Sequence, residues 1–316
     1  MIKGVKIMNP SIKSKLLKNK AILALIALCV LISIITPRFL TLVNITNVLT
    51  QVSVNAIIAV GMTFVILTGG IDLSVGSILA ICGAVSAVIV KSTGNIFLAI
   101  IIPIIIGAVV GLFNGFIISR CKLQAFVATL ATMTIFRGLT YVYTKGNPVS
   151  SLTMAYNNIA NAKIGIIPLP VIFTIIITIV AYHFLSNTVF GTHLYALGGN
   201  EDSARLSGIN TNKVKTIAYI VCGTTAAISG IIATSRIGSA SPNAGTGFEL
   251  DAIASVVLGG TSLLGGEGSV LGTIIGALII GVLNNGLNLI NVSPFYQQIV
   301  KGIVILLAVL ADKKSK

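Results

Sequence analysis

Seven uncharged polar side chains stand inside stretches of the sequence that are otherwise apolar. They are Gln51, Asn55, Thr63, Asn114, Asn284, Asn285 and Asn288. A buried amide is costly in an apolar environment unless it is hydrogen-bonded or hydrated. Amides and hydroxyls without fixed charge suit a hydroxylated solute, so these residues are candidates for lining a path across an apolar layer. The competing interpretation is hydrogen bonding between neighbouring helices, which we expect for about half of them.

Two glycine-rich runs each carry an acid and a serine, namely GGIDLSVG at 69–76 and GGTSLLGGEGS at 259–269. The candidate residues are Gly69, Gly70, Asp72 and Ser74 in the first run, and Gly265, Gly266 and Glu267 in the second. Asp72, Ser74 and Ser269 can cap the helix that follows each run. The runs are therefore either two capped turns, or broken-helix elements at a pathway or a cytoplasmic docking surface. Neither run is a GxxxxGK[ST] phosphate loop, so we expect no ATP bound by this chain through such a loop.

The polar segment GGNEDSARLSGI at 198–209 has the signals of a short helix. Asn200 is a good N-cap, acids follow it in the first turn, and Gly208 is a good stop. We predict a helix over about residues 201–207. A loop needs no ordered helix merely to connect two spans, so we interpret it as a docking element for a cytoplasmic partner. The residues assigned to this contact are Asn200, Glu201, Ala204, Arg205 and Gly208.

The reactive side chains form no catalytic or metal-binding constellation. The cysteines are Cys29, Cys82, Cys121 and Cys222, which are far apart and form no CxxC pair. His183 and His193 have no acidic neighbour suited to zinc. We therefore expect no disulfide, metal or cofactor. An intramembrane enzyme would need a cluster of His, Cys or acid in its apolar segments, and the sequence offers none.

The composition indicates the solvent in which these residues work. Of the 316 residues, 55% are hydrophobic and 9% are charged, and the mean hydropathy is +1.03. A soluble domain has about 25% charged residues. Most of this surface therefore faces a bilayer, which excludes a soluble enzyme, a disordered regulator and a secreted disulfide scaffold. We expect an all-α, polytopic membrane domain that occupies residues 1–316.

Ten apolar stretches predict about ten transmembrane helices, some of them short or broken by glycine. The stretches cover residues 21–36, 48–68, 75–91, 96–118, 124–144, 167–186, 216–235, 250–264, 269–290 and 297–311. No cleavage motif follows the first stretch, so we interpret it as an uncleaved span. The stretch at 250–264 is short, and whether it crosses the membrane is the weakest step of this count.

The basic residues predict an orientation for these spans. The net charge is +14, and a topology with ten crossings places 14 of the 21 Lys and Arg residues inside and 5 outside. This is the positive-inside pattern, which we prefer to nucleic-acid binding. Residues 1–20, the loop 187–215 and the C-terminus are then cytoplasmic. The loops 145–166 and 236–249 are extracytoplasmic.

Short motifs suggest internal symmetry. GLFNG at 111–115 and GVLNNG at 281–286 lie late in spans that run in opposite directions in this topology. That relation predicts an inverted repeat, a common basis for alternating access. Glycine at every fourth position from 107 to 115 also predicts close backbone packing between helices.

Five runs carry a resemblance to a known family. They are GMTFVILTGGIDLSVG at 61–76, AFVATLATMTIFRG at 125–138, YALGGNEDSARLSGI at 195–209, GTGFELDAIASVVLGGTSLLGGEG at 245–268 and GVLNNGLNLI at 281–290. Together they span nearly the whole chain, which resembles the permease subunits of bacterial monosaccharide ABC importers. The resemblance implies a path for ribose or a similar monosaccharide in the cytoplasmic membrane.

The same resemblance implies partners. It implies a second permease copy, a cytoplasmic ATPase that holds ATP and Mg²⁺, and an extracytoplasmic sugar-binding protein. The segment 200–208 would couple to the ATPase, and loops 145–166 and 236–249 would meet the binding protein. The alternative is a stand-alone secondary carrier for a small polar solute. We disfavour it because no carboxylate stands out in the middle of a span, as ion coupling would require.

Overall fold

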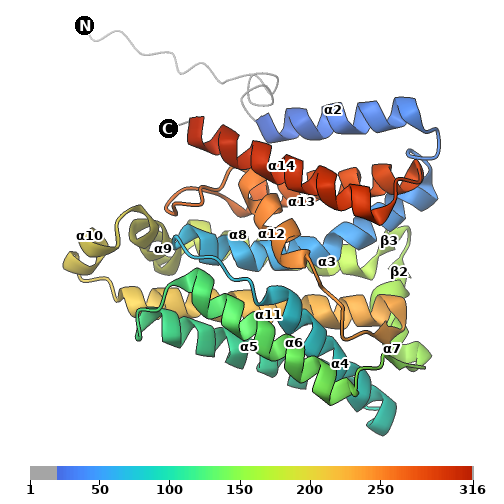
Figure 1. Cartoon of the computed structure of the whole chain (residues 1–316), viewed down its shortest axis with the longest axis horizontal. Helices are drawn as coiled ribbons and strands as arrows, with labels where there is room; N and C mark the ends of the chain where they lie inside the picture. Colours follow the sequence, from blue (N-terminus) through green and yellow to red (C-terminus); the bar gives the residue numbers. More distant parts are fainter. Residues whose placement is uncertain (1–19, 315–316) are drawn as a thin grey trace, which may run out of the picture.

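The computed structural model describes residues 20–314, and this part of the chain is a bundle of helices with very short strands (Figure 1). Within it, seven helices are long and apolar enough to cross a membrane: α3 (Leu42–Leu67), α4 (Val75–Thr93), α5 (Ile96–Ser119), α6 (Ala125–Thr144), α8 (Leu169–Asn187), α11 (Thr211–Ile237) and α13 (Val270–Leu289). The basic residues predicted to be cytoplasmic at 1–19 lie outside the described residues.

The remaining helices are shorter or less apolar. They are α2 (Lys20–Ile35), α7 (Met154–Asn161), α9 (Val189–Gly199), α10 (Glu201–Leu206), α12 (Phe248–Leu258) and α14 (Pro294–Lys314). Two antiparallel pairs of two-residue strands complete the described part: β1 (Val149–Ser150) with β4 (Ser239–Ala240), and β2 (Lys163–Ile164) with β3 (Ile167–Pro168). The predicted all-helical class is confirmed, because these strands only tie loops together.

The bundle has two ends with different loops (Figure 1). One end, called the α10 end, carries α9, α10 and the connections 68–74, 120–124 and 259–269. The opposite end, called the α7 end, carries α7 and both strand pairs. The sequence-based topology predicts that the α10 end is cytoplasmic and the α7 end extracytoplasmic.

Burial separates the central helices from those at the edge. In α3 the most apolar window is 83% buried, whereas in α6 and α8 it is only 22% buried. Lipid tails are as apolar as leucine, so outward apolar faces on α6 and α8 are expected in a bilayer. Helix α11 packs against α3, α4 and α5. The most apolar windows of α3, α4 and α11 are each at least 61% buried, so these three helices form the centre of the structure.

The predicted close packing of the glycine-spaced helix is confirmed. A Cβ atom on Gly107 would lie 2.5 Å from the Gly223 carbonyl oxygen, and one on Gly111 would lie 2.2 Å from the Tyr219 oxygen. Helices α5 and α11 therefore approach each other backbone to backbone, as small residues permit in membrane bundles.

The stretch 250–264 is not a full-length helix, which agrees with the prediction that some of the apolar stretches are short or broken. Helix α12 has 11 residues, or about 16 Å at 1.5 Å per residue, against a hydrocarbon layer of about 30 Å. Glycines end it, because Gly260 has a φ of +88° and Gly265 one of +91°. The non-helical segment 259–269 returns to the α10 end, where the Gly266 N–H donates to the Leu67 oxygen.

Helices α5 and α13 run in opposite directions, as the predicted inverted repeat requires. Asn114 of α5 lies at the α10 end, where it donates to Ser74. Asn285 of α13 is hydrogen-bonded to Asn44, which stands at the start of α3 and therefore at the α7 end of the bundle. The opposed directions agree with the repeat, which stays a prediction because the motifs are short.

Candidate functional site

Four of the seven polar candidates line one cavity, here called the amide cavity. Gln51 and Asn55 reach it from α3, and Asn284 and Asn288 reach it from α13. Each pair is spaced four residues apart, which places both side chains on one face of a helix. The cavity has a volume of about 290 Å³. Its other polar lining residues are Arg236, Asp251, Gln297 and Lys301, from α11, α12 and α14.

Two amide oxygens of the amide cavity are left without a protein partner. Asn55 donates through Nδ2 to Ser255 Oγ at 3.4 Å, but its Oδ1 atom is buried and accepts no hydrogen bond within the described chain. The Oδ1 atom of Asn284 is also buried and accepts no hydrogen bond from the described residues. A buried acceptor without a partner is costly unless water or a solute supplies a donor. The cavity can therefore accept hydrogen bonds from a hydroxylated solute.

Three charged residues at the amide cavity were not assigned to a site from the sequence. Lys301 Nζ lies 2.9 Å from Asp251 Oδ2, and Arg236 lines the same cavity. Sequence reasoning placed all three at or near the outer ends of spans and did not connect them. Asp251 and Lys301 are 50 positions apart in the sequence. The spacing of Gln297 and Lys301 on one helix face was the available signal.

The other three polar candidates make bonds between helices. The Thr63 and Thr273 hydroxyls are 2.8 Å apart. Asn114 Nδ2 donates to Ser74 Oγ at 2.9 Å. Asn285 exchanges two hydrogen bonds with Asn44, of 2.9 and 3.0 Å. The structural interpretation offered for about half of the set therefore applies to these residues, because their polar atoms serve helix association.

The two glycine-rich runs meet at the α10 end, which the sequence did not predict. A Cβ atom on Gly265 would lie 2.8 Å from the Gly69 nitrogen, and one on Gly198 would lie 1.9 Å from the Leu67 oxygen and 2.3 Å from the Gly266 nitrogen. The ends of α3 and α9 and the segment 259–269 thus touch through their backbones. We call this contact, formed by Gly69, Gly198, Gly265 and Gly266, the glycine junction. Gly70 lies beside the Tyr219 hydroxyl, and the Glu267 side chain is exposed.

Asp72 lies beside the glycine junction and is fully buried. Its Oδ1 atom accepts from the Ser74 backbone N–H at 2.9 Å and from the Ser74 hydroxyl at 2.5 Å. The predicted side-chain capping of α4 is wrong: the N-cap residue is Ser74, whose side chain makes no cap bond, and Asp72 accepts from the N–H of Ser74 just before the helix. Ser74 instead links Asp72 to Asn114, because its hydroxyl accepts from the Asn114 amide.

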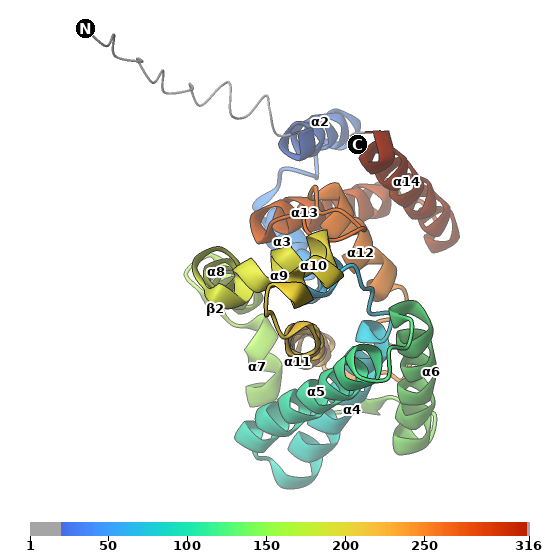
Figure 2. The same cartoon turned by 90° about the vertical axis from the view of Figure 1, so that its left-hand side faces the viewer.

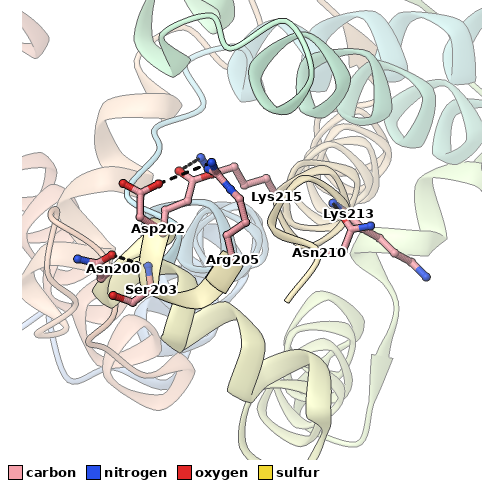
Figure 3. A network of polar contacts seen from close by, with 8 residues as sticks. Asn200, Asp202, Ser203, Arg205, Asn210, Lys213 and Lys215 are labelled. Carbon is pink, nitrogen blue, oxygen red and sulfur yellow. Dashed lines mark hydrogen bonds and ion pairs between the residues drawn. The ribbon is translucent and has the colours of Figure 1, made fainter. Parts of the chain in front are cut away.

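Helix α10 forms where the sequence predicts it, over Glu201–Leu206 (Figure 3). Asn200 Oδ1 accepts from the Ser203 N–H at 2.8 Å, which confirms the N-cap. Gly208, with a φ of +86°, follows the last turn. Lys215 of α11 binds Glu201 at 2.6 Å, and Arg205 lies 3.5 Å from the same carboxylate. The Lys215 pair fastens α10 to the start of α11, and the Arg205 pair lies within α10.

The charges around α10 set the state of Glu201. Partial burial alone would raise the pKa of this carboxyl, but the hydrogen bond and charge of Lys215, helped by the charge of Arg205, lower it overall. Glu201 is therefore an anion that holds Lys215 in place. Ala204 is buried beneath the helix.

The outer face of α10 offers a surface to a partner. The Leu206 side chain is 90% exposed, although leucine prefers to be buried. Beside α10 lies a cavity of about 660 Å³, whose lining includes Gly70, Lys122, Arg205 and Lys215. A single exposed leucine is ordinary at a protein surface, so the docking role of α10 stays a prediction.

The two loops predicted to be extracytoplasmic are joined at the α7 end. Strand β1 belongs to the loop 145–166 and pairs with β4 of the loop 236–249. Arg137 Nη1 donates to the Pro242 and Ala244 oxygens at 2.7 and 2.8 Å. Lys91 Nζ donates to the Ser150 oxygen at 3.0 Å. The two loops therefore present one connected surface.

Comparisons with known proteins agree along almost the whole chain. The family model described as "Branched-chain amino acid transport system / permease component" matches residues 44–309. The ribose import permease protein of Escherichia coli (strain K12) is 51% identical over 309 residues, which cover 96% of each chain. That of Bacillus subtilis (strain 168) is 53% identical over 296 residues, covering 93% of this chain and 92% of its own. The D-allose transport system permease protein of Escherichia coli (strain K12) is 41% identical over 276 residues, covering 87% and 85%. No solved structure matches the chain.

Proposed function

This chain belongs to the family of transport-system permease components, and from that premise we propose that it is the membrane-spanning subunit of an ABC importer for ribose or a similar monosaccharide. The observation that carries the proposal is the identity to ribose import permeases over nearly the full length. The protein acts in the bacterial cytoplasmic membrane. This agrees with the seven helices of the described part that are long and apolar enough to span a membrane.

The amide cavity suits a sugar as its solute. Its volume, about 290 Å³, lies at the lower end of the range of about 300–1,000 Å³ typical of small-molecule sites. The free Oδ1 atoms of Asn55 and Asn284 accept hydrogen bonds from hydroxyl groups. We place the translocation path through this cavity. Thr63, Asn114 and Asn285 support the walls of the path without contacting the solute.

The α10 end suits a cytoplasmic ATPase. Helix α10 is capped, fastened to α11 and exposed at Leu206. The neighbouring glycine junction connects it to α3 and to the segment after α12. A displacement of α10 can therefore be passed to α3, which lines the amide cavity, and to the segment that joins α12 to α13. ATP and Mg²⁺ belong to that partner, and this chain supplies the gated path and no hydrolytic chemistry.

The α7 end suits the extracytoplasmic sugar-binding protein, because its two loops form one surface through β1 and β4. A second copy of the chain completes the path, and we propose a homodimer. Both termini and the loop 187–215 are cytoplasmic in this assignment. The chain forms one membrane domain over residues 1–316.

Uptake into proteoliposomes tests the proposal. The chain is reconstituted with its ATPase and binding protein, and radiolabelled ribose, allose and arabinose are offered in turn with ATP inside. We expect ATP-dependent accumulation of at least one of them. A Leu206→Glu variant keeps the fold, since this side chain is exposed, and is expected to lose ATPase binding. No accumulation of any sugar by the complete wild-type assembly would refute the proposal.

The secondary carrier is kept as a second candidate because of two carboxylates. Asp72 is fully buried, and Asp251 is buried within α12. The sequence-based argument concerned carboxylates in the middle of a span, and neither of these lies there: Asp72 is in the connection 68–74, and Asp251 is in the first turn of α12. The identity to ribose import permeases carries the case for an ATP-driven importer.

A further inference from the structure

Helix α14 is attached to the bundle differently from the other helices of the amide cavity. It lies at the edge of the bundle beside α12 and α13 (Figure 2). None of its described side chains is fully buried. Large apolar side chains on it, including Phe295 and Ile299, are more than half exposed. Apolar packing within the chain therefore contributes little to holding α14 in place.

The contacts that do hold α14 are polar and lie on the amide cavity. Gln297 and Lys301 are four residues apart, on one face of the helix. Gln297 Nε2 donates to Asn288 Oδ1 at 2.8 Å. Lys301 Nζ lies 2.9 Å from Asp251 Oδ2. The four side chains all line the cavity, so this stripe of α14 forms one of its walls.

A polar wall of this kind can be exchanged for a solute. A partly buried ion pair gains little net free energy over hydration of its charges, because desolvation offsets the attraction. The Lys301 and Asp251 side chains retain 25% and 10% of their exposure. A hydroxyl can donate to Asp251 or Asn288 in place of α14, so a contact within the protein is replaced by one with the solute. Apolar packing offers no such exchange.

We propose that α14 is the moving wall of the amide cavity, and that sugar hydroxyls compete with Gln297 and Lys301 for Asn288 and Asp251. The inference rests on the proposed function, because it takes the solute to be a sugar. Gln297 and Lys301 are positioning residues that hold the empty cavity closed. Arg236 lines the same cavity without an acidic partner within the described residues, and it stays available to the sugar when α14 moves.

The first test locks the wall. Asp251→Cys and Lys301→Cys are combined in a chain whose four native cysteines are replaced by alanine or serine. The pair is bridged in the assembled transporter with a short bis-methanethiosulfonate, which a reductant cleaves. We expect ribose uptake to fall to background when the bridge is formed and to return after reduction. For each single cysteine variant, the uptake rate should be the same before and after the treatment, because only the pair can be bridged. Uptake that is as fast with the bridge as without it would overturn the proposal.

The second test needs no transport. A reporter thiol, Asn284→Cys, is placed in the same cysteine-free chain and labelled with a reagent that does not cross the membrane. Lys301→Ala is expected to raise the labelling rate by about fivefold or more, the lower end of typical coupling between sites. The swapped pair Asp251→Lys with Lys301→Asp should bring the rate back toward wild type. The exposed Ile299→Ala on the same helix serves as the control.

The uptake and labelling measurements distinguish a failure of the proposed function from a failure of the proposal that α14 moves. If the unbridged wild-type assembly takes up no sugar, the proposed function fails, whatever α14 does. Uptake can be normal while the Asn284→Cys reporter is labelled at the same rate with and without Lys301→Ala, and also in the swapped pair. In that case only the proposal that α14 moves is refuted.

Discussion

Two neighbouring asparagines show how residue types divide into separate roles. Asn284 lines the amide cavity and has a free Oδ1 atom. Asn285 is buried and paired with Asn44 through two hydrogen bonds. One residue turns a helix by about 100°, so adjacent side chains point to different surroundings. The sequence marks both positions as costly polar groups in an apolar span, but it does not tell which face meets the cavity.

The pair provides matched variants. Asn285→Leu leaves the Asn44 amide buried without its partner, which costs about 1–3 kcal/mol of unfolding free energy. Asn284→Leu removes an acceptor that only the solute uses, so we expect weaker ribose uptake with little loss of stability. Thermal unfolding in detergent and uptake in proteoliposomes measure the two effects. If Asn284→Leu unfolds as easily as Asn285→Leu and transports normally, the division of roles is wrong.

Glu201 provides a pH-dependent prediction. Its pKa is held below its ordinary value of 4.5, because the charges of Lys215 and Arg205 outweigh the effect of burial. A lowered pKa in the folded state means that the ion pairs stabilise α10 fully above the ordinary pKa. This contribution is lost as the pH falls from there through the lower folded value.

We therefore expect α10 to loosen on acidification below about pH 4.5, which is the ordinary pKa of a glutamate side chain. Hydrogen exchange of residues 201–215, corrected for the intrinsic pH dependence of amide exchange, measures the change. Glu201→Gln should exchange faster at neutral pH and show no such acid step. A step of equal size in the variant would mean that another group is responsible.

At the scale of elements, the glycine junction explains why distant segments share glycine pairs. Gly198, at the end of α9, touches Leu67 of α3 and Gly266 through backbone atoms. The next residue, Gly199, has open space where a Cβ atom would lie. The two glycines look equivalent in the sequence, and only the packing of three segments separates them.

Alanine substitution tests the junction. Gly198→Ala places a methyl group 1.9 Å from the Leu67 oxygen, and backbone atoms cannot rotate away as a side chain can. We expect a loss of about 1–3 kcal/mol, as overpacked sites show, together with a weaker coupling of ATP hydrolysis to uptake. Gly199→Ala should stay within about 0.5 kcal/mol of wild type. Denaturant unfolding in mixed micelles gives both values, and equal values for the two variants would contradict a tight junction.

The elements also show where sequence reasoning succeeds. Helix α10 has a cap, acids in its first turn and a glycine stop, so local signals predict it within one residue. The span at 250–264 has no comparable signal for its end. Its apolar residues suggest a helix through 264, but Gly259 packs against α13 and the chain leaves the helix there. Contacts made by tertiary structure decided that boundary.

At the scale of the whole molecule, the amide cavity depends on five helices that the sequence does not connect. The candidates on α3 and α13 were predicted from their polarity alone. Asp251 and Lys301 meet because α14 lies beside α12, whose first turn carries Asp251. Polarity and periodicity thus predict which residues are costly in a membrane. They do not predict which of them share a cavity, because that follows from how the helices pack.

The energy source for transport is also a property of the whole molecule. Two buried carboxylates, Asp72 and Asp251, leave an ion-coupled carrier chemically conceivable. Each has an oxygen that is already engaged, however: Asp72 Oδ1 accepts from Ser74 and Asp251 Oδ2 pairs with Lys301, whereas Asp72 Oδ2 is buried without a partner among the described residues. A carboxylate that carries a coupling ion must release such partners in every cycle. We therefore expect that neither drives transport, and that the free energy comes from ATP on a separate subunit.

Reconstitution of the lone chain tests this last point. In proteoliposomes without the ATPase, we expect no accumulation of labelled ribose above its external concentration, with or without an imposed proton or sodium gradient. Addition of the ATPase, the binding protein and ATP should produce accumulation from the same preparation, which controls for inactive protein. Asp72→Asn keeps the hydrogen bonds of the buried site and should leave any ion dependence unchanged. Accumulation by the lone chain on a proton or sodium gradient, abolished by Asp72→Asn, would instead identify a secondary carrier.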